Sequence, residues 1–449
     1  MKRSIPSSNA ASKAKKARVE IPDYHLTPSV KDESGNPIWP APDDQMARAR
    51  ELIVECAKAN QKTLICPDKD ADGLTSGVIL LRTLVALGLP ESLIDVHLVQ
   101  KGAAVVDEAE RKAIASKQPK YIFILDHGSR KSPPVVPYPH KTLVIDHHYA
   151  TESDFPDDSD HVTACNSPPV ATTSLLTYTL CTALHPSVVE QCSWLCVIGT
   201  HGDLGSTIKW EAPFPDMTAT LQAHSKKALN DAVSLVNAPR RTAAYDVASA
   251  WAALAGAADG PAPLLRNARL HEARREVAAE VERWTHTAPR FSADARVAVL
   301  RIASAAQVHP VVATRWAAHL RSSKLEVVMV ANDGYLPGRV SFSCRIPKCA
   351  RARDPPVNLI ETLRGIAEGG EDGLLERLGD SFARGHKEAS GGIISKECFE
   401  ELMGVMGVGE KPVVRKAGEN KKSVEKGTQR NTLMNYFAKS GQDLKGGVT

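Results

Sequence analysis

Residues 63–73 read Thr-Leu-Ile-Cys-Pro-Asp-Lys-Asp-Ala-Asp-Gly, an apolar run that passes directly into three alternate carboxylates, Asp68, Asp70 and Asp72. The apolar part has the length and composition of a buried strand. Alternate side chains at the end of a strand point to one face. Like charges held this close repel strongly unless a cation neutralises them. The stretch therefore predicts a strand that ends in a cation site, with an exposed acidic turn as the alternative.

Apolar runs of strand length recur downstream and alternate with helical patterns. This alternation indicates a parallel α/β sheet covered by helices. The predicted strands are 63–66, 94–99, 121–125 and 142–145, and the predicted helices are 46–59, 76–87, 174–183, 187–198 and 213–235. Strand patterns resume at 297–302, 325–330 and 339–344, and a helical pattern follows at 357–367. These later segments predict a second α/β domain.

Three further acidic segments follow apolar elements. Asp126 comes after one predicted strand, Asp146 with His147 and His148 after another, and Asp203 lies in a Gly-flanked loop after an apolar helix. Functional sites of open α/β sheets form outside the carboxyl ends of the strands. Neutral imidazole joins carboxylates readily as a ligand of manganese, iron or zinc. We therefore expect one edge of the sheet to gather these groups around metal.

The order and context of the four acidic segments resemble the four motifs of the DHH phosphoesterase superfamily, over about residues 64–205. Residues 384–392, Arg-Gly-His-Lys-Glu-Ala-Ser-Gly-Gly, resemble the glycine-rich signature of the DHH-associated domain that follows in that family. The resemblance implies a parallel-sheet catalytic domain joined by a helical linker to a smaller α/β domain. It also implies a hydrolase that uses two divalent metal ions, usually manganese, with magnesium as the alternative.

The resemblance also implies roles for the acids and histidines of these segments, all of them in one dinuclear site. Asp70 would bind the first metal, with Asp68 in or near its ligand shell, and Asp126 would bind both metals. The second metal would also be bound by Asp72, His147 and Asp203. Asp146 would orient His147 or contribute to a shell, and His148 would face the substrate phosphate. Two such metals lower the pKa of a bridging water and neutralise charge on the attacked phosphate. Hydrolysis then needs no nucleophilic side chain.

The second domain is expected to hold the rest of the substrate. Arg345 is a candidate for bidentate phosphate contact, with a surface arginine as the alternative interpretation. His386 and the backbone of Gly391 and Gly392 are candidates to receive a phosphate or a chain end, because glycine permits close backbone approach. Arg240 is a further substrate-binding candidate, within the segment 235–241.

The subfamily is indicated by two features. Residues 235–241 resemble the segment after the catalytic domain of RecJ-type exonucleases, which degrade single strands from the 5′ end. Small pyrophosphatases of the superfamily carry a histidine where this chain has Cys66, which disfavours that activity. We therefore predict a single-stranded nucleic acid exonuclease of DNA repair.

Nothing in the sequence resembles the additional OB-fold of bacterial RecJ, so an oligoribonuclease or cyclic-dinucleotide phosphodiesterase is the alternative. A catalytically silent replication scaffold is the third hypothesis, and the full set of acids argues against it.

Five segments are expected along the chain, with a Gly/Pro break at 256–263 inside the third. They are a basic disordered tail and lead-in at 1–45, the catalytic domain at 46–235, a helical connector at 236–290, the DHH-associated domain at 291–408 and a basic disordered tail at 409–449.

The charge of the chain is concentrated in its two tails. Residues 1–19 carry six Lys/Arg and no acid, and residues 411–449 carry nine Lys/Arg against three acids, whereas the whole chain has a net charge of only +4. The rest is therefore acidic. Basic tails bind nucleic acid or carry import signals, and the spacing of the first tail resembles a bipartite nuclear signal. We predict residence in the nucleus, with the cytoplasm as an additional location, and solvated tails without a partner are the alternative.

The second tail contains an apolar cluster at helical spacing, Leu433, Tyr436 and Phe437. The cluster resembles the box by which replication and repair enzymes dock on the PCNA sliding clamp, although Arg430 stands where that box has Gln. A short helix packed on the protein's own core is the alternative.

Composition excludes other classes. No apolar run is long enough for a membrane span, and the N-terminus lacks the apolar stretch of a secretory signal. The nine cysteines are scattered and odd in number, which favours a reducing compartment, and Cys192 and Cys196 are expected in a helical core.

Overall fold

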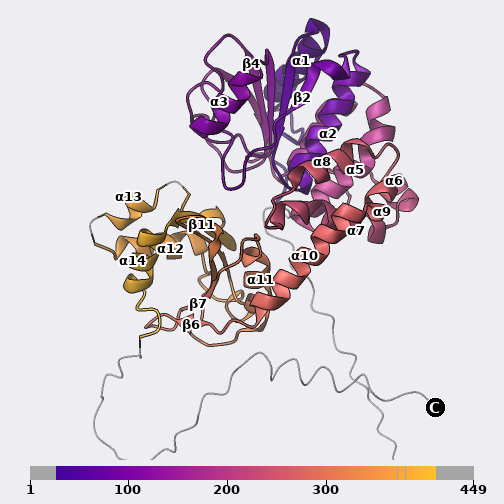
Figure 1. Ribbon diagram of the computed structural model, residues 1–449. Helices are drawn as coiled ribbons and strands as arrows, with labels where there is room; N and C mark the ends of the chain where they lie inside the picture. Colours follow the sequence, from indigo (N-terminus) through magenta and orange to yellow (C-terminus); the bar gives the residue numbers. More distant parts are fainter. Residues whose placement is uncertain (1–26, 372, 380, 411–449) are drawn as a thin grey trace, which may run out of the picture. The chain divides into compact units, whose positions relative to one another are not determined.

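The structure is a computed structural model that describes residues 27–371, 373–379 and 381–410. The described chain divides into two compact units (Figure 1). Unit 1 ends at Val233 and contains everything before it except the short segment Gln100–Ala103, which belongs to unit 2. The predicted connector 236–290 thus falls within unit 2. The predicted clamp motif of Leu433, Tyr436 and Phe437, like the predicted nuclear signal, lies outside the described residues.

Unit 1 contains a five-stranded parallel sheet in the order β2-β1-β3-β4-β5, as the alternating pattern predicted. Its strands are β1 (Thr63–Pro67), β2 (Ile94–Val96), β3 (Tyr121–Leu125), β4 (Lys141–Asp146) and β5 (Ser159–Thr163). Every residue of β1 and β3 is buried, which explains why they read as unbroken apolar runs. β2 is shorter than predicted. β5 was not predicted because its sequence, Ser-Asp-His-Val-Thr, is mostly polar and only half-buried.

The helices of unit 1 are α1 (Asp43–Ala59), α2 (Ala71–Ala86), α3 (Glu108–Ser116), α4 (Thr173–Thr182), α5 (Ser187–Leu204), α6 (Thr218–Ala223) and α7 (Lys226–Asn237), with a short 3₁₀ turn at Glu91–Leu93. α2, α4 and α5 pack on one another, and α1 joins them, whereas α3 covers the opposite face of the sheet (Figure 1). α6 and α7 replace the single helix predicted at 213–235, because the chain turns at residues 224–225.

α2 begins five residues earlier than predicted, and this difference positions the acidic segment. The Asp70 carboxylate caps the helix by accepting hydrogen bonds from the N–H groups of Asp72 and Gly73, at 3.1 and 3.2 Å. The acidic stretch is therefore half loop and half first turn of a helix. Gly73 is required there, because a Cβ would approach the Asp68 backbone to 2.7 Å.

Unit 2 contains a mixed six-stranded sheet in the order β10-β11-β9-β8-β7-β6. Its strands are β6 (Arg290–Phe291), β7 (Val297–Ile302), β8 (Val327–Leu336), β9 (Arg339–Arg345), β10 (Arg384–His386) and β11 (Ala389–Ser395). The glycine-rich signature thus forms an antiparallel hairpin at the edge of the sheet. β7 and β8 are the parallel pair, and the other pairs are antiparallel.

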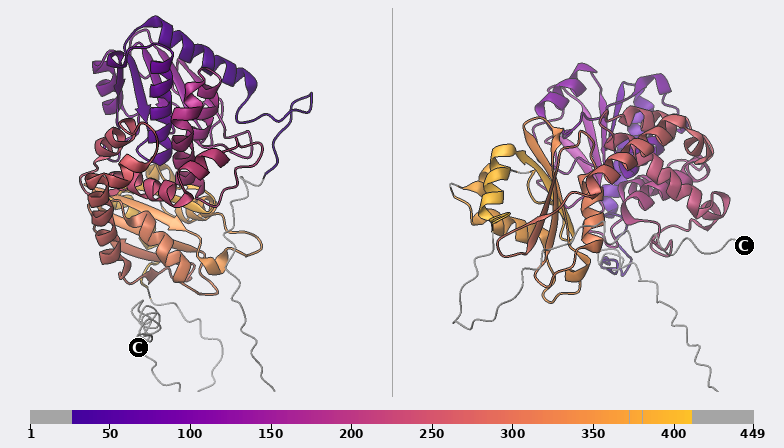
Figure 2. Two further views of the ribbon diagram at one scale, coloured as in Figure 1. Left: turned by 90° about the vertical axis from the view of Figure 1, so that its right-hand side faces the viewer. Right: turned by 60° about the horizontal axis from the view of Figure 1, so that its bottom comes forward.

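The helices of unit 2 are α8 (Val247–Ala255), α9 (Ala262–Arg266), α10 (Ala268–Thr285), α11 (His309–His319), α12 (Leu359–Glu368), α13 (Leu374–Leu378) and α14 (Lys396–Val405), with 3₁₀ turns at Pro239–Arg241 and Lys348–Ala350. The helices from α10 onward cover the two faces of the sheet (Figure 2). α10 and α11 share one apolar core with the sheet, and α12, α13 and α14 share the other. Within the described ranges, no helix combines the length and the apolar character that a membrane crossing requires.

Candidate metal centre

The acidic segments lie at the carboxyl edge of the parallel sheet of unit 1. Asp68 directly follows β1, Asp126 directly follows β3, and Asp146 is the last residue of β4. The strand ends are tied together, because the Asp68 N–H donates to the Leu125 carbonyl and the Asp126 N–H donates to the Ile145 carbonyl, both at 2.9 Å. Each acid thus leaves the sheet beside the next.

The side chains of these segments form three overlapping groups whose oxygen and nitrogen atoms lie within 4.8 Å of one another. The groups are Asp68, Asp70 and Asp126; Asp72, His147 and Asp203; and Asp126, His147 and His148. Every residue predicted as a metal ligand is therefore brought to one place. Asp126 and His147 each belong to two of the three groups, so these two residues connect them.

His147 is the clearest sign that the cluster fits a cation. Its Nε2 atom is buried and has no hydrogen-bond partner of acceptable geometry among the described residues. The same atom lies 3.2 Å from Asp203 Oδ2, 3.3 Å from Asp126 Oδ1 and 4.0 Å from Asp72 Oδ2. A ring nitrogen directed at carboxylate oxygens is a donor set for divalent metals such as manganese. The residues present could therefore hold a metal ion.

The electrostatics of the protein without metal lead to the same conclusion. Burial raises the pKa of Asp126 well above its usual range, and the charge of Asp72 raises it further. Burial, and then the charge of Asp203, raises the pKa of Asp72 to about 6. Burial alone would lower the pKa of His147, but the carboxylates of Asp126 and Asp203 raise it well above the usual value. The carboxylates are thus held in an environment that disfavours their charge until a cation arrives.

The N-terminus of α4 contributes residues that were not among the predicted site residues. The N–H groups of Thr173 and Ser174 donate to the two oxygens of Asp72 at 2.7 and 2.9 Å, and the Thr173 hydroxyl donates to Asp126 Oδ1 at 2.9 Å. Helix N-termini stabilise negative charge in this way. The Thr-Thr-Ser stretch at 172–174 indicates a helix cap, but the sequence does not reveal which acid that cap faces.

Asp146 holds the loops in place and has little capacity left for a metal. Its Oδ2 accepts from the N–H groups of Gly128 and Ser129, at 3.0 Å each, and from the Ser129 hydroxyl at 2.7 Å. Its Oδ1 accepts from the backbone of His147 and from both the backbone and the ring of His148, at 2.8, 3.2 and 2.8 Å. Burial opposes the charge, but the histidine and hydroxyl contacts hold the pKa of Asp146 below its usual range. The ring that Asp146 orients is therefore that of His148, whereas the prediction was that Asp146 orients His147 or contributes to a metal shell.

His127 is a further residue that the motif analysis passed over. Its Nε2 lies 2.9 Å from the Cys66 carbonyl, and its Nδ1 lies 3.7 Å from Asp68 Oδ1. Asp126, immediately before it, has a positive φ of 73°, which is uncommon for a residue other than glycine. Backbone strain of this kind often occurs at functional sites.

The predicted substrate-binding residues lie in unit 2. Arg345, the last residue of β9, is half-buried and donates to the Ser343 hydroxyl and the Cys344 carbonyl, both at 2.8 Å. Burial lowers the pKa of Arg345, and no carboxylate of the described residues pairs with it. Arg240 donates through Nε to Asn237 at 3.1 Å. His386 is the last residue of β10 and pairs with Ala389.

Gly391 and Gly392 are required by packing. A Cβ at Gly391 would collide with the Phe342 carbonyl of β9, and a Cβ at Gly392 would reach the Ser381 carbonyl at 2.5 Å. The close approach that these glycines permit is therefore to the protein's own backbone. Their contact with substrate stays a prediction.

His309 and Arg241 accompany Arg345 and were not predicted as site residues. His309, the first residue of α11, is buried, and its Nδ1 has no hydrogen-bond partner in the described part of the chain. Burial, followed by the charges of Arg345 and Arg241, lowers the pKa of His309 to about 3. The two guanidinium groups thus lie close enough to His309 to keep its ring neutral near pH 7, and the three residues are called the cluster of Arg345, His309 and Arg241 below.

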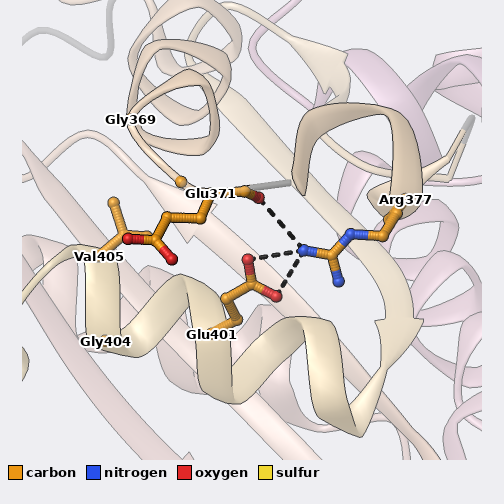
Figure 3. A pocket seen from close by; sticks show the side chains of 7 residues that line it. Gly369, Glu371, Arg377, Glu401, Gly404 and Val405 are labelled. Carbon is orange, nitrogen blue, oxygen red and sulfur yellow. Dashed lines mark hydrogen bonds and ion pairs between the residues drawn. The ribbon is translucent and has the colours of Figure 1, made fainter. Parts of the chain in front are cut away.

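A pocket on unit 2 lies between the C-termini of α12 and α14 and the segment around α13 (Figure 3). Arg377 points across it and donates to both Glu401 oxygens at 2.7 Å and to the Glu371 carbonyl at 3.4 Å. Within the pocket, Arg377 and Glu401 neutralise each other. The pocket contains none of the predicted site residues.

The comparisons with known proteins agree with this geometry. Residues 62–200 match the model of the DHH family, N-terminal domain. No curated protein matches the sequence.

Three solved structures share the fold. The exonuclease RecJ bound to manganese is 18% identical with a TM-score of 0.54, over 83% of this chain and 95% of that one. RecJ from Thermus thermophilus in complex with Mn²⁺ is 19% identical with a TM-score of 0.55, over 83% of this chain and 55% of that one. The DHH domain of a member of a family of ribosomal proteins is 14% identical with a TM-score of 0.54, over 81% of this chain and 90% of that one.

At these identities the likeness establishes the fold. The family match and the acidic cluster support a metal-dependent phosphoesterase.

Proposed function

Because the chain carries the N-terminal domain of the DHH family, we propose that it is an exonuclease that hydrolyses single-stranded nucleic acid, DNA in particular, from the 5′ end. The observation that carries the proposal is the buried Nε2 of His147, which is surrounded by carboxylates and lacks a hydrogen-bond partner among the described residues. A ring nitrogen that three carboxylates approach at 3.2 to 4.0 Å is a donor arrangement that suits a divalent cation.

The ligand set divides around Asp126. Asp68 and Asp70 would hold one divalent ion with it, and Asp72, His147 and Asp203 would hold the other, by their grouping in the structure. We propose manganese, with magnesium as the alternative. Such ions, when bound, supply an activated water and neutralise charge on the attacked phosphate. The protein's own part is to fix the ligands, through the α4 N-terminus on Asp72 and the Thr173 hydroxyl on Asp126.

His148 is suited to the substrate side of the cluster. Its ring is half-exposed, it is oriented by its contact with Asp146 at 2.8 Å, and it belongs to a metal-binding group with Asp126. Burial lowers its pKa, but the charge of Asp146 raises it to a net value above the usual one. A protonated imidazole at this position would donate to a phosphate oxygen.

A polyanionic substrate is supported by the cluster of Arg345, His309 and Arg241. Each of these side chains offers N–H donors, and the guanidinium of Arg345 lacks a carboxylate partner in the described residues. Phosphate is the common biological anion that arginine binds in a bidentate manner. We propose that this cluster, with Arg240 and the His386–Gly392 hairpin as further candidates, contacts the substrate backbone.

The main alternative is cleavage of two- to five-nucleotide substrates or cyclic dinucleotides by the same site. A catalytically silent scaffold is disfavoured, because all six predicted metal ligands are present and gathered.

The test is degradation of end-labelled oligonucleotides by the full-length protein with Mn²⁺, on single- and double-stranded DNA, on RNA and on two- to five-mers. Stepwise loss of long single-stranded DNA from the 5′ end, absent in Asp126→Ala, is expected. Cleavage of only the shortest substrates would establish the alternative. Metal binding without any hydrolysis would establish the scaffold.

We also propose that the enzyme works in the nucleus and docks on the PCNA sliding clamp through Leu433, Tyr436 and Phe437. The apolar spacing of these residues within a basic segment supports the proposal. Clamp affinity should fall in the double variant Tyr436→Ala and Phe437→Ala, while hydrolysis is unchanged. Equal affinity of variant and wild type would remove this part of the proposal.

A further inference from the structure

Tyr149 is the most exposed large apolar side chain of the described residues. It is 82% exposed, whereas the other large apolar side chains that are exposed are valines with exposures of 38–52%. Tyr149 follows Asp146, His147 and His148 directly in the sequence. Two residues of chain span at most about 7 Å, so its Cα lies within that distance of the His147 Cα. An aromatic ring is therefore open to water next to the metal ligands.

The residue before Tyr149 is fixed in place. The N–H and the ring of His148 both donate to Asp146 Oδ1, at 3.2 and 2.8 Å. The ring of His148 also packs edge-on against the ring of His147, with centroids 4.7 Å apart. Because Asp146 is itself held by the 128–129 turn, the backbone entering Tyr149 has little freedom.

The chain after Tyr149 is fixed as well. Ala150 is buried, and its carbonyl accepts from the Cys165 thiol at 3.6 Å. The N–H and hydroxyl of Thr151 both donate to Asp154 Oδ2, at 2.8 and 2.7 Å. Further along, Phe155 is buried and stacks on His161 at 3.9 Å. Hydrogen bonds therefore hold the backbone on both sides of Tyr149, while its own ring stays exposed.

A rigid, exposed aromatic ring is a surface on which a flat apolar group can stack. Unpaired nucleobases are the flat groups that a nucleic acid brings to a phosphodiester site, and stacking does not depend on which base is present. A base inside a duplex already stacks on both faces and is not available. The ring therefore favours substrates with unpaired bases.

We propose that Tyr149 stacks on an unpaired nucleobase next to the scissile phosphate and so selects single-stranded substrates. The inference deepens the proposed function and rests on it. Stacking needs the ring and not the hydroxyl, so Tyr149→Phe should behave as wild type. The predicted loss belongs to Tyr149→Ala alone.

The experiment compares wild type, Tyr149→Ala and Tyr149→Phe as full-length proteins with Mn²⁺. The substrates are a single-stranded DNA 12-mer and the same 12-mer with abasic nucleotides in the two terminal positions at the attacked end. Val189→Ala, a change at another exposed apolar residue, is the matched control. KM of Tyr149→Ala on the normal 12-mer should rise by about 5- to 150-fold, the range that base stacking gives, with kcat changed far less. On the abasic 12-mer, wild type and Tyr149→Ala should have the same KM.

An unchanged KM on the normal 12-mer would overturn the inference, and so would an equal rise on both substrates. A parallel measurement, anisotropy of a labelled 12-mer with protein in EDTA, separates the two proposals. If wild type hydrolyses nothing, the proposed function fails, and weaker binding by Tyr149→Ala but not by Tyr149→Phe would still support stacking. Equal binding by all variants would remove the stacking role.

Discussion

Burial disfavours the charged form of side chains in two places. One is the carboxylate cluster of unit 1, and the other is the cluster of Arg345, His309 and Arg241 in unit 2. In the first, burial and neighbouring acids raise the pKa values of Asp72 and Asp126. In the second, burial lowers the pKa of Arg345, and burial with neighbouring cations lowers that of His309. In both clusters burial disfavours the charged forms of the side chains, and we propose that a metal cation offsets this in the first and a substrate phosphate in the second.

Other charged groups of unit 2 show that this is not the general state of the domain. Arg301 donates to Glu400 at 2.7 and 3.0 Å and to Asp333 at 2.9 Å. Arg353 donates to Glu326 at 3.0 Å. Both of these arginines thus form ion pairs with carboxylates within the domain. Arg345 differs from these two arginines, because it donates to the Ser343 hydroxyl and the Cys344 carbonyl, and we propose that the substrate supplies its anionic partner.

The largest effect is expected for Asp126→Asn. Asp126 belongs to two metal-binding groups, so its loss should lower kcat on the order of 10³-fold or more and weaken Mn²⁺ binding. The metal-free variant should nevertheless unfold at the same or a higher temperature at pH 7, because burial and the charge of Asp72 disfavour the Asp126 carboxylate in the folded protein and the amide carries no such penalty. Thermal denaturation and single-turnover kinetics measure the two quantities.

The matched control is Asp157→Asn, which changes an exposed acid paired with Lys131 at the surface. It should leave kcat unchanged. If the metal-free Asp126→Asn protein is clearly less stable than wild type, then Asp126 stabilises the fold. That result would contradict the conclusion that the carboxylate cluster is unfavourable without a cation.

The second effect is a pH dependence of stability in the metal-free protein. The pKa of Asp72 is about 6 in the folded state against an ordinary value of 3.8, so the folded protein retains a proton that the unfolded chain releases. Its contribution is present at low pH and is lost as the pH rises from about 4 to about 6, by at most about 3 kcal/mol. The raised pKa of His147 acts in the same direction at higher pH.

His309 acts in the opposite direction, because its lowered pKa makes the folded protein less stable as the pH falls below about 6.5. Subtracting the unfolding free energy of Asp72→Asn from that of wild type cancels the contribution of His309, because both proteins contain it. Measured by urea denaturation in EDTA, wild type should lose stability relative to the variant as the pH rises from 4 to 6. A difference that is constant over this range would contradict the raised pKa of Asp72.

The parallel sheet and the acid edge could be predicted because both depend on local sequence. Fully buried parallel strands are apolar throughout, as in β1 and β3, and Asp68 and Asp126 follow these two strands without an intervening residue. The start of α2 was misplaced by five residues, because Asp70 serves both as helix cap and as a member of the metal cluster. The apolar pattern alone did not reveal the first turn.

The supporting residues could not be predicted, because they depend on contacts between distant segments. Thr173 reaches Asp126 across 47 residues of sequence, and nothing around Thr173 indicates an acid nearby. Nothing in the sequence around His309 indicates a special role. Only the fold brings Arg345 and Arg241 close enough to lower its pKa. Gly391 and Gly392 were interpreted as ligand contacts, and only the structure shows that β9 requires them.

The smallest effect distinguishes Arg345 from Arg301. Arg345→Met should raise KM for single-stranded DNA about 10-fold, the value of one charged hydrogen bond, and should leave the unfolding free energy nearly unchanged. The slope of log binding constant against log salt concentration should become less steep by about one unit in this variant, because one phosphate contact is lost. Arg301→Met should do the reverse, lowering stability by about 1 kcal/mol or more through loss of its pairs with Asp333 and Glu400, with KM unchanged. If both variants lose stability and neither changes KM, then Arg345 serves the fold as Arg301 does, and the positive cluster receives no phosphate.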